Sequence, residues 1–465
     1  MFELGGKKTL VIGLARTGVA TSLFCAKHGA IVTAVDTRPE SELADAAAKL
    51  REAKISLGLG GYSDKILDGQ DLVVPSPGVP ADSDILEAAR AHNIPIWSEI
   101  ELADRFLHGR LIGITGSNGK TTTTSLIEHI LKNSGYATLL AGNIGTPLIG
   151  VVESTTDQTV TVAELSSFQL EWIETFRPNI SVFLNLTPDH LDRHGSMEAY
   201  GAAKARIFEK QTGSDFAILN ADDPASTPYA PTKPKVFWFS RKQRVAQGAF
   251  LRGEEIVFRH DGAEEVILKQ SEIPLPGAHN LENVLAAVVA ARLTGAQPKE
   301  IAKAVRSFAG VEHRLEFVAE HNGVRYYNDS KATNVDATLK ALDAFPGRIL
   351  IILGGKDKGS DYTVLLTPLH EKAILALLIG AAADKIEKQI QGSVAIERAG
   401  TIHRAVEIAS RAAQPGDIVL LAPACASFDQ FEDYEHRGRV FKQLVHELAN
   451  HKAHSASGPA ALGKR

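Results

Sequence analysis

The sequence predicts an α/β protein of three domains, each built on a mainly parallel sheet with helices. Three times the chain shows an apolar run, a turn rich in glycine or aspartate, and then helical periodicity. This alternation is typical of parallel strands joined by crossover helices. The length of 465 residues also exceeds what one hydrophobic core usually serves. We expect domains at residues 1–98, 99–312 and 313–465, with a disordered tail from about residue 450 because that stretch is small and polar.

Composition and charge place the protein among ordinary globular proteins. Hydrophobic residues make up 44% and charged residues 23% of the chain, and the net charge of -5 argues against a nucleic-acid partner. The two cysteines, Cys25 and Cys425, lie far apart, which favours a reducing compartment over a disulfide framework. No secretory leader is visible, and the longest apolar runs reach about half the length of a membrane span. We therefore expect a cytoplasmic monomer without a membrane span.

The first domain opens with a strand, a tight turn and a helix. In "KTLVIGLARTG" the strand ends at Gly13 and the helix begins near Thr17, and in "AIVTAVDTRPE" a second strand ends at Asp36. An acidic residue at that position suits ribose hydroxyls. Ala15 replaces the middle glycine of a dinucleotide fingerprint, so a plain turn without a ligand remains an alternative. The segment "VVPSPGVP" ends another strand, at the edge where open sheets bind ligands.

The second domain opens with a loop suited to phosphate, "GITGSNGKTTTTS". The standard phosphate loop would have glycine at position 114, where this chain has Ile114. The remaining "TGSNGKTT" still points backbone N–H groups at an anion from a helix start. Lys120 adds a positive charge near the transferred group, and the hydroxyl of Thr121 suits Mg²⁺. A glycine turn capped by threonines is the alternative.

Acidic and imidazole side chains follow two later strands of this domain. Mg²⁺ requires carboxylate oxygen, and the strand "TVTVAELSSFQLE" supplies Glu164, although a purely structural glutamate is possible. His190 follows the next strand within a cluster that also contains Asp189, Asp192 and His194. Imidazole is an unusual Mg²⁺ ligand, so a solvated loop is the alternative for this cluster.

Several motifs together resemble one enzyme family. The segments "TGSNGKT", "AGNIG", "DHLDRHG" with "AKARIF", and "HNLENVLAA" are similar to those of the Mur ligases, ATP-dependent amide ligases of peptidoglycan precursor synthesis. The segments "YNDSKATN" and "CASFDQFEDYEHRG" resemble the branch that adds D-glutamate to UDP-N-acetylmuramoyl-L-alanine. The resemblance implies that ATP phosphorylates the carboxylate of that substrate. The amine of D-glutamate then attacks the acyl phosphate, and ADP and phosphate are released.

The resemblance also implies roles for residues of the central domain. Glu164 and His190 match metal-site residues, and Lys204 matches a lysine that CO₂ converts into a carbamate able to bind metal. With Thr121 these residues would hold Mg²⁺, and two ions are expected. Asn280 and Asn283 match an asparagine pair at the ATP site, with helix capping as the alternative. The residues expected to bind the ATP phosphates are Gly116, Ser117, Asn118, Gly119, Lys120, Thr121 and Thr122.

The third domain is expected to complete the ATP site and to bind D-glutamate. His313 and Arg314 match a pair that faces the ATP phosphates, Asp329 suits the ribose, and Lys331 follows in the same loop. Together with Lys120, Glu164, His190 and Lys204, the pair His313 and Arg314 forms the expected catalytic set. For D-glutamate the resemblance implies Thr333, Lys358 and Ser427, with the backbone near Tyr434; plain surface positions are the alternative for Lys358 and Ser427. The family commonly has phenylalanine in place of Tyr434, and some members have an acidic residue in place of Lys356.

The first domain would then bind the UDP moiety. The matching residues are Leu14, Arg16, Thr17, Gly18, Asp36, Thr37, Arg38, Ser76 and Gly78, together with Asn143 of "AGNIG" in the central domain. The missing middle glycine, which counts against NAD, does not count against this ligand.

Three rival functions differ in what they require. Another three-domain ligase, such as a folylpolyglutamate synthase, would not need the complete strand-turn-helix unit that precedes "TGSNGKT". A nucleotide-driven switch would release phosphate with ATP alone. An NAD-dependent oxidoreductase would leave the Lys-Thr phosphate loop unexplained.

Overall fold

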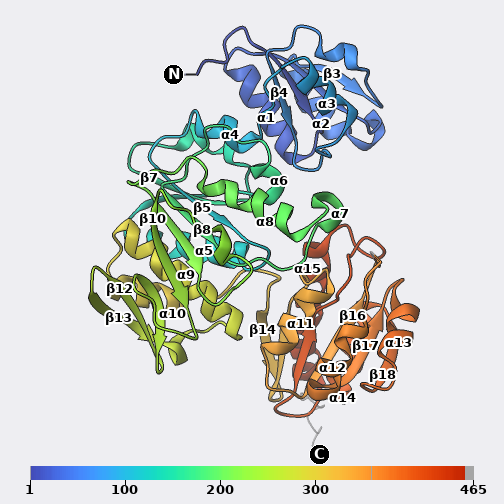
Figure 1. Ribbon diagram of the computed structural model, residues 1–465. Coiled ribbons are helices and arrows are strands. Elements are labelled where there is room, and N and C mark those ends of the chain that lie inside the picture. Colours follow the sequence, from blue (N-terminus) through green and yellow to red (C-terminus); the bar gives the residue numbers. More distant parts are fainter. Residues whose placement is uncertain (1, 358, 456–465) are drawn as a thin grey trace, which may run out of the picture. The chain divides into compact units, whose positions relative to one another are not determined.

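The computed structural model describes residues 2–357 and 359–455. The chain divides into two compact units, one formed by Met1–Ile273 with Leu281–Phe308 and the other by Pro274–Asn280 with Ala309–Arg465. The first unit contains two sheets and the second contains one (Figure 1). The expected α/β architecture with three mainly parallel sheets is confirmed, whereas the exact domain boundaries stay predictions.

The first sheet has four parallel strands in the order β3-β2-β1-β4. The strands are β1 (Lys8–Ile12), β2 (Ile31–Asp36), β3 (Ser56–Leu59) and β4 (Leu72–Pro75), and the helices are α1 (Arg16–Lys27), α2 (Ala44–Glu52) and α3 (Asp84–Ala91). The predicted strand-turn-helix unit is confirmed, with the helix starting at Arg16. A Cβ on Gly18 would lie 1.8 Å from the carbonyl oxygen of Gly13, so this close turn requires glycine at position 18.

The central sheet has nine strands in the order β13-β12-β11-β10-β9-β8-β5-β7-β6. Its parallel part consists of β5 (Arg110–Thr115), β6 (Ala137–Gly142), β7 (Thr159–Glu164), β8 (Ile180–Phe183), β9 (Phe216–Asn220), β10 (Lys235–Ser240) and β11 (Gly248–Arg252). Two antiparallel strands, β12 (Glu255–His260) and β13 (Ala263–Lys269), extend it. The alternation of strands and helices expected from the sequence does not include this extension.

Helices of several lengths accompany the central sheet. They are α4 (Glu99–Asp104), α5 (Lys120–Asn133), α6 (Ser167–Leu170), α7 (Leu191–His194), α8 (Met197–Ala205), α9 (Ala278–Thr294) and α10 (Pro298–Ser307). Because the carboxyl ends of parallel strands share one edge of a sheet, the loops after β5, β7 and β8 lie near one another. That edge carries the phosphate loop.

The third sheet has six strands in the order β14-β15-β19-β16-β17-β18, and only β14 is antiparallel to its neighbour. The strands are β14 (Glu316–His321), β15 (Val324–Asn328), β16 (Ile349–Gly354), β17 (Ala373–Ile379), β18 (Ile396–Gly400) and β19 (Ile418–Leu421). The helices are α11 (Val335–Asp343), α12 (Leu366–Lys372), α13 (Ala383–Ile390), α14 (Ile402–Ala412) and α15 (Tyr434–Ser455).

Helix α15 reaches Ser455 and so enters the stretch expected to be a disordered tail. Residues 450–455 continue this helix, and the expected tail stays a prediction. Residues 456–465, to which the rest of that prediction applies, lie outside the described residues.

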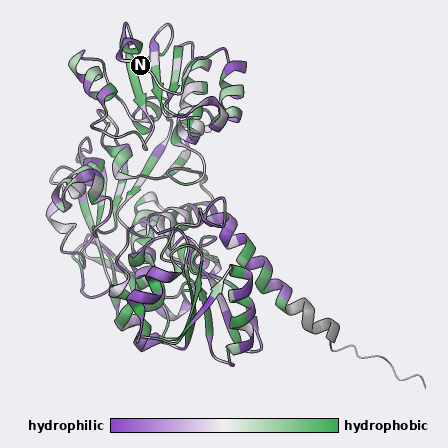
Figure 2. Ribbon diagram, turned by 90° about the vertical axis from the view of Figure 1, so that its right-hand side faces the viewer, coloured by the Kyte–Doolittle hydropathy of each residue, from purple (hydrophilic) through white to green (hydrophobic). Residues whose placement is uncertain are grey.

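The third sheet is buried on both faces. Along β16, Ile351 and Leu353 belong to one hydrophobic cluster, whereas Leu350 and Ile352 belong to another. Such alternation between two cores explains why the strand reads as a continuous apolar run. Figure 2 shows hydrophobic residues concentrated in the strands and hydrophilic residues spread over the helices. Among the described helices, none has the length and apolar character needed to cross a membrane.

Candidate functional site

The phosphate loop joins β5 to α5, as the sequence predicted. Gly119 is the N-cap of α5 and has a φ of 84°, a left-handed conformation that favours glycine. A Cβ at this position would also lie 2.3 Å from Oδ1 of Asn283. Ile114, where the standard motif would have glycine, is instead buried within β5. The loop therefore forms without the first glycine of the motif.

The ammonium of Lys120 lies against the loop itself. Its Nζ donates to the carbonyl oxygens of Gly116 and Ser117, at 2.8 Å each. Thr122 follows in the first turn of α5, and its hydroxyl is buried without a hydrogen-bond partner among the described residues. A cation and the start of a helix thus converge where an anion would bind.

Glu164 joins two of the other predicted residues at the end of β7. Thr121 donates its hydroxyl to Oε2 of Glu164 at 2.7 Å, and the amide of Asn143 donates to Oε1 at 3.1 Å. The backbone N–H of Asn143 also donates to the carbonyl oxygen of Glu164. Glu164 is only 3% exposed. The structure therefore brings the carboxylate of Glu164, the hydroxyl of Thr121 and the amide of Asn143 together beside the phosphate loop.

Lys204 reaches the same loop from α8. It is 1% exposed, and its Nζ donates to the carbonyl oxygen of Gly116 at 2.9 Å. Burial lowers the pKa of Lys204 well below its usual value, and the charge of Lys120 lowers it further, while Asp189 and Glu164 oppose this shift. An exposed helix lysine would be the ordinary expectation for such a sequence, and the structure excludes it.

His190 lies at the N-cap of α7, near the aromatic rings of Phe168 and of Tyr200 in α8. Its ring centroid is 4.9 Å from that of Phe168 and 6.4 Å from that of Tyr200. The side chain is 49% exposed, and Nε2 is 3.6 Å from Oδ2 of Asp189. His194 is less exposed and its Nε2 lies 3.0 Å from the hydroxyl of Ser167. The side chain of Asp192 lies outside the described residues.

The two asparagines of α9 are both buried. The amide of Asn280 donates to the carbonyl oxygen of Pro276 at 2.7 Å, within the second compact unit. Oδ1 of Asn283 accepts from the hydroxyl of Thr123 at 3.2 Å, within the first. Asn283 therefore contacts the helix that follows the phosphate loop, which a simple capping role does not require.

In the first domain, Asp36 organises the turn that was predicted to bind UDP. Oδ2 accepts from the backbone N–H of Leu14 at 2.7 Å, and both carboxylate oxygens accept from the guanidinium of Arg38. Burial opposes ionisation, but the hydrogen bonds from Arg38 and Leu14 overcome it and lower the pKa of Asp36 to about 2. Ser76, at the end of β4, donates to the carbonyl oxygen of Gly13 at 2.6 Å. Exposed positions around this turn include Arg16, Thr37 and Gly78, while Thr17 is half-buried.

In the third domain, His313 is buried and oriented by Asn328. The amide nitrogen of Asn328 donates to Nδ1 of His313 at 2.8 Å, which leaves the imidazole proton on Nε2. Burial lowers the pKa of His313, so the ring is neutral at pH 7. Nε of Arg314 is buried and has no hydrogen-bond partner within the described part of the chain.

The loop after β15 carries the other predicted ATP residues of this domain. Burial raises the pKa of Asp329 to about 6, although Arg314 and the N–H of Leu315 act in the opposite direction. The backbone N–H of Lys331 donates to the carbonyl oxygen of His313 at 3.1 Å. The Nζ of Lys331 lies 5.5 Å from the ring centroid of Tyr434 at the start of α15. Residues from three segments thus meet at one end of the sheet.

Two of the residues predicted to bind D-glutamate, Thr333 and Ser427, lie on the loops that follow the neighbouring strands β15 and β19. Ser427 is 2% exposed, which excludes the alternative of a plain surface position, and Thr333 is half-buried. Lys356 and Ala426 pair through two backbone hydrogen bonds, which joins the loops after β16 and β19. Lys358 lies outside the described residues.

Sequence reasoning missed the residue that braces the phosphate loop. Asn185 follows β8, and its side chain accepts from the N–H of Asn118 at 2.9 Å and donates to its carbonyl oxygen at 3.1 Å. The carbonyl oxygen of Asn185 also accepts from the N–H of Ser117. The available signal was its place at a strand end, in "FLNLTPDH". Tyr200, one helical turn before Lys204, was missed as well, and its ring centroid lies 4.4 Å from the Nζ of Lys204.

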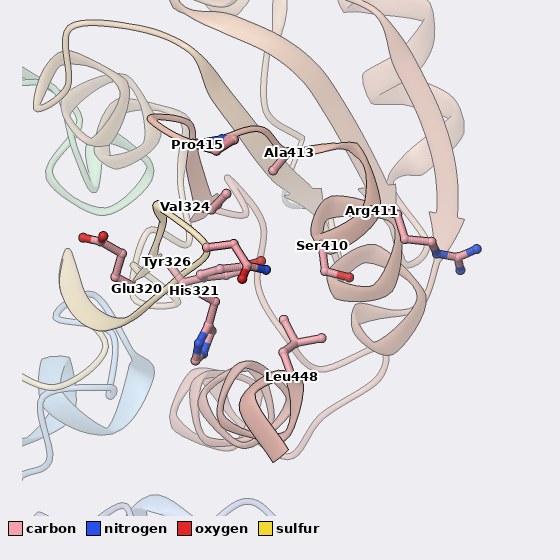
Figure 3. Close-up of a pocket in the computed structure, with 10 residues that line it drawn as sticks. Glu320, His321, Val324, Tyr326, Ser410, Arg411, Ala413, Pro415 and Leu448 are labelled. Atoms are coloured by element: carbon pink, nitrogen blue, oxygen red, sulfur yellow. The ribbon is translucent and has the colours of Figure 1, made fainter. Parts of the chain in front are cut away.

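A separate cavity of about 640 Å³ lies at the opposite end of the third sheet. It is bordered by the β14–β15 hairpin, the end of α14 and helix α15, and its lining includes His321, Tyr326, Ser410 and Leu448 (Figure 3). Val324, at the amino end of β15, also lines it, whereas Asp329 follows the carboxyl end. The cavity contains none of the residues predicted from the sequence.

Three parts of the chain match described domains of one family. Residues 7–98 match the Mur ligase MurD-like N-terminal domain, residues 114–291 match the Mur ligase middle domain, and residues 313–425 match the Mur ligase glutamate ligase domain.

Solved structures of similar fold carry related names. The MurF ligase from Thermotoga maritima in complex with ADP is 16% identical, with a TM-score of 0.60 over 96% of this chain and 100% of that one. A pseudomurein peptide ligase type C from Methanothermus fervidus is 19% identical, with a TM-score of 0.58 over 95% of this chain and 100% of that one. At these identities the likeness concerns the fold.

Closer relatives cover almost the whole chain. The "UDP-N-acetylmuramoylalanine--D-glutamate ligase" of Koribacter versatilis is 52% identical over 448 residues, which are 96% of this chain and 99% of the relative. The protein of the same name from Acidobacterium capsulatum is 54% identical over 446 residues, which are 95% of this chain and 97% of the relative. With matches in all three domains and relatives that cover almost its whole length, this chain belongs to the Mur ligase family.

Proposed function

We propose that this protein is an ATP-dependent ligase that joins the amine of D-glutamate to the alanine carboxyl group of UDP-N-acetylmuramoyl-L-alanine. The γ-phosphoryl group of ATP first passes to that carboxylate, and attack by the amine then displaces inorganic phosphate. The product would serve peptidoglycan precursor synthesis. The observation that carries this proposal is the identity of 52% and 54% to relatives of that name over nearly the full chain.

The phosphate loop supports the role of ATP. Backbone N–H groups at the start of α5 and the ammonium of Lys120 would hold the phosphates, after Lys120 exchanges the carbonyl oxygens of the loop for phosphate oxygens. Asn185 keeps the backbone of Asn118 in place for this purpose. Two anions, a carboxylate and a triphosphate, must meet here, so cations and fixed dipoles have to neutralise them first.

The residues around Glu164 fit Mg²⁺. A buried carboxylate and the hydroxyl of Thr121, 2.7 Å away, are the hard oxygen ligands that this ion prefers. His190 and a carbamate on Lys204 would contribute to a second ion. When bound, Mg²⁺ supplies positive charge that stabilises the phosphoryl oxygens during transfer.

The surroundings of Lys204 support its carbamylation. The reaction requires a neutral amine, and burial together with Lys120 favours that form. Addition of CO₂ to the neutral amine forms a nitrogen–carbon bond and releases one proton. The ammonium form of Lys204 would be repelled by Lys120, whereas the resulting carbamate is an anion attracted by it.

The outer domains would supply the remaining contacts. The turn held by Asp36 and Arg38 would bind the UDP moiety. In the third domain, the neutral His313 and the guanidinium of Arg314 offer N–H donors to phosphate, Asp329 and Lys331 would contact ATP, and D-glutamate would bind at the loops of Thr333, Lys358, Ser427 and Tyr434. The two buried free thiols are consistent with a reducing cytoplasm, and we propose that the enzyme acts there as a monomer.

The proposal is tested by phosphate release with each substrate omitted in turn. We expect release only when ATP, UDP-N-acetylmuramoyl-L-alanine and D-glutamate are all present, and no product with L-glutamate. Release with ATP alone would favour the nucleotide-driven switch. Oxygen-18 placed in the alanine carboxyl group should appear in the released phosphate, and its absence there would exclude the acyl phosphate.

A further inference from the structure

The guanidinium of Arg437 is completely buried in the third domain and bonds to oxygens of two different loops. Its Nε donates to the hydroxyl of Ser330 at 2.9 Å, and Nη2 donates to the carbonyl oxygen of Ser330 at 2.8 Å. Both terminal nitrogens also donate to the carbonyl oxygen of Cys425 at 3.2 Å, and Nη1 donates to that of Ala426 at 3.4 Å. One side chain of α15 therefore joins the loop after β15 to the loop after β19.

The hydrogen bonds of Arg437 go to uncharged acceptors. Every acceptor is a neutral oxygen, and no carboxylate within the described residues lies at ion-pair distance from this side chain. Burial lowers the pKa of Arg437 to about 10, yet the group remains charged at neutral pH. The charge of Asp429 acts on Arg437 without forming an ion pair among the described residues. A buried charge without a direct ion pair is a poor way to stabilise a fold, so the geometry of its five donors is the more informative property.

The two loops joined by Arg437 are those that carry the proposed ligand contacts. Ser330 lies between Asp329 and Lys331, which are expected to contact ATP. Ala426 immediately precedes Ser427, which is expected to contact D-glutamate. The hydroxyl of Ser330 donates in addition to the carbonyl oxygen of Tyr434 at 2.7 Å, so the start of α15 is tied to the same point.

We infer that Arg437 is a positioning residue that fixes the loop after β19, proposed to contact D-glutamate, against the loop after β15, proposed to contact ATP. It acts through Ser330 and through the carbonyl oxygens before Ser427, without contacting the reactants. The inference rests on the proposed function, because it assigns the two loops to those ligands. A lysine at this position would keep the charge but could not form the planar fork that reaches both loops.

The test compares steady-state constants of Arg437→Lys and Ser330→Ala with those of the wild-type enzyme. We expect the KM for D-glutamate to rise about tenfold or more and the KM for ATP to rise as well, because charged hydrogen bonds that order both loops are lost. The KM for UDP-N-acetylmuramoyl-L-alanine should change less than about twofold, since its proposed contacts lie elsewhere. A purely structural role would lower the melting temperature and the amount of active enzyme without this selective change in KM.

Arg398→Lys is the matched control, because Arg398 is an exposed arginine of the same domain that pairs with Asp384 and Glu387. Its kinetic constants should equal those of the wild type. If Arg437→Lys does not fold, Ser330→Ala decides, since it removes the acceptor of Nε and leaves the charge in place. Unchanged KM values for D-glutamate and ATP in the folded variants overturn the inference. A wild-type enzyme that releases phosphate without D-glutamate would instead overturn the proposed function.

Discussion

Lys120 and Lys204 donate to the same carbonyl oxygen, that of Gly116, at 2.8 Å and 2.9 Å. The two amines come from the start of α5 and from the last turn of α8. Two full positive charges at this separation repel each other, and Lys204 is the one deprived of water. The carbonyl oxygen of Gly116 in the phosphate loop therefore lies between the Lys120 ammonium, a cation suited to phosphate, and the Lys204 amine, which favours its neutral form.

Lys204→Ala is expected to lose nearly all ligase activity, because the carbamate that would bind metal cannot form. Wild-type enzyme depleted of CO₂ should regain activity when bicarbonate is added, which phosphate release can follow. Lys210→Ala, which changes an exposed lysine near the end of the same segment, should behave as the wild type. Full activity in Lys204→Ala would contradict the proposed carbamate.

Thr121→Val is expected to raise the Mg²⁺ concentration needed for half-maximal activity by about 10- to 100-fold, because it removes a hydroxyl 2.7 Å from Glu164 while keeping the side-chain shape. The measurement is a magnesium titration of the rate. Thr124→Val serves as the control, since the Thr124 hydroxyl donates only to the carbonyl oxygen of Lys120 one turn away. Equal magnesium requirements in both variants would show that Thr121 plays no part in metal binding.

Asn185→Ala is expected to raise the KM for ATP about tenfold, because the two side-chain bonds that hold the backbone of Asn118 are lost. Asn185→Asp should have a larger effect, since it also places a negative charge beside the phosphates. The exposed Asn133, which donates to the carbonyl oxygen of His129, provides the control variant Asn133→Ala. An ATP affinity that is the same in all three variants would reject the bracing role.

Glu99 makes stability depend on pH. It is 1% exposed, and burial raises its pKa to about 7, although its Oε1 accepts from the N–H of Ile149 at 2.6 Å. Because the folded-state pKa lies above the unfolded value of about 4.3, the folded protein binds this proton more tightly. The resulting stabilisation is complete at low pH and is lost as the pH rises through 7.

Glu99→Gln mimics the protonated side chain at every pH. We expect its melting temperature relative to the wild type to increase between pH 5 and pH 8, with a free-energy difference of at most about 3 kcal/mol. Thermal unfolding at several pH values measures this. A melting difference that does not vary with pH would mean that Glu99 is not the titrating group.

Gly18→Ala is expected to destabilise the first domain by about 1–3 kcal/mol, since the new methyl group would meet the carbonyl oxygen of Gly13. The position lies within α1, where alanine would otherwise be favoured, so any loss comes from the close contact. Calorimetric unfolding and the KM for the UDP substrate are the measurements. Gly5→Ala, which has open space around it, is the control.

The sequence was most informative where one local pattern determines both conformation and chemistry. The strand, glycine loop and helix around Lys120 could be predicted, as could the strand ends at Asp36 and Glu164, because such units are fixed by short-range geometry. The resemblance to Mur ligases then indicated Lys204, whose burial no local pattern reveals. The ligand roles of these residues stay predictions.

Contacts between distant segments could not be predicted in the same way. Asn185 braces a loop 67 positions away, and Arg437 reaches Ser330 over 107 positions. In these cases the residue type allows many partners, and only the folded arrangement selects one. Asp36 differs in another way: its position at a strand end was predicted, but its carboxylate accepts hydrogen bonds from Leu14 and Arg38, which sequence spacing did not indicate.

The antiparallel extension of the central sheet was missed although a local signal existed. Asp261 and Gly262 separate β12 from β13, and both have positive φ, at 49° and 82°, as expected for the tight turn of a hairpin. The alternation of strands and helices, on which the predicted fold rests, does not indicate this turn. A parallel fold can therefore carry an antiparallel edge that its dominant pattern conceals.

That hairpin also gives the chain a region that tolerates changes of sequence. Asp261 and Gly262 are exposed, and no residue proposed to bind a ligand lies in β12, in β13 or between them. Insertions and substitutions in this turn should therefore leave the chemistry undisturbed during evolution. An epitope or fluorophore inserted there would label the enzyme while leaving catalysis intact.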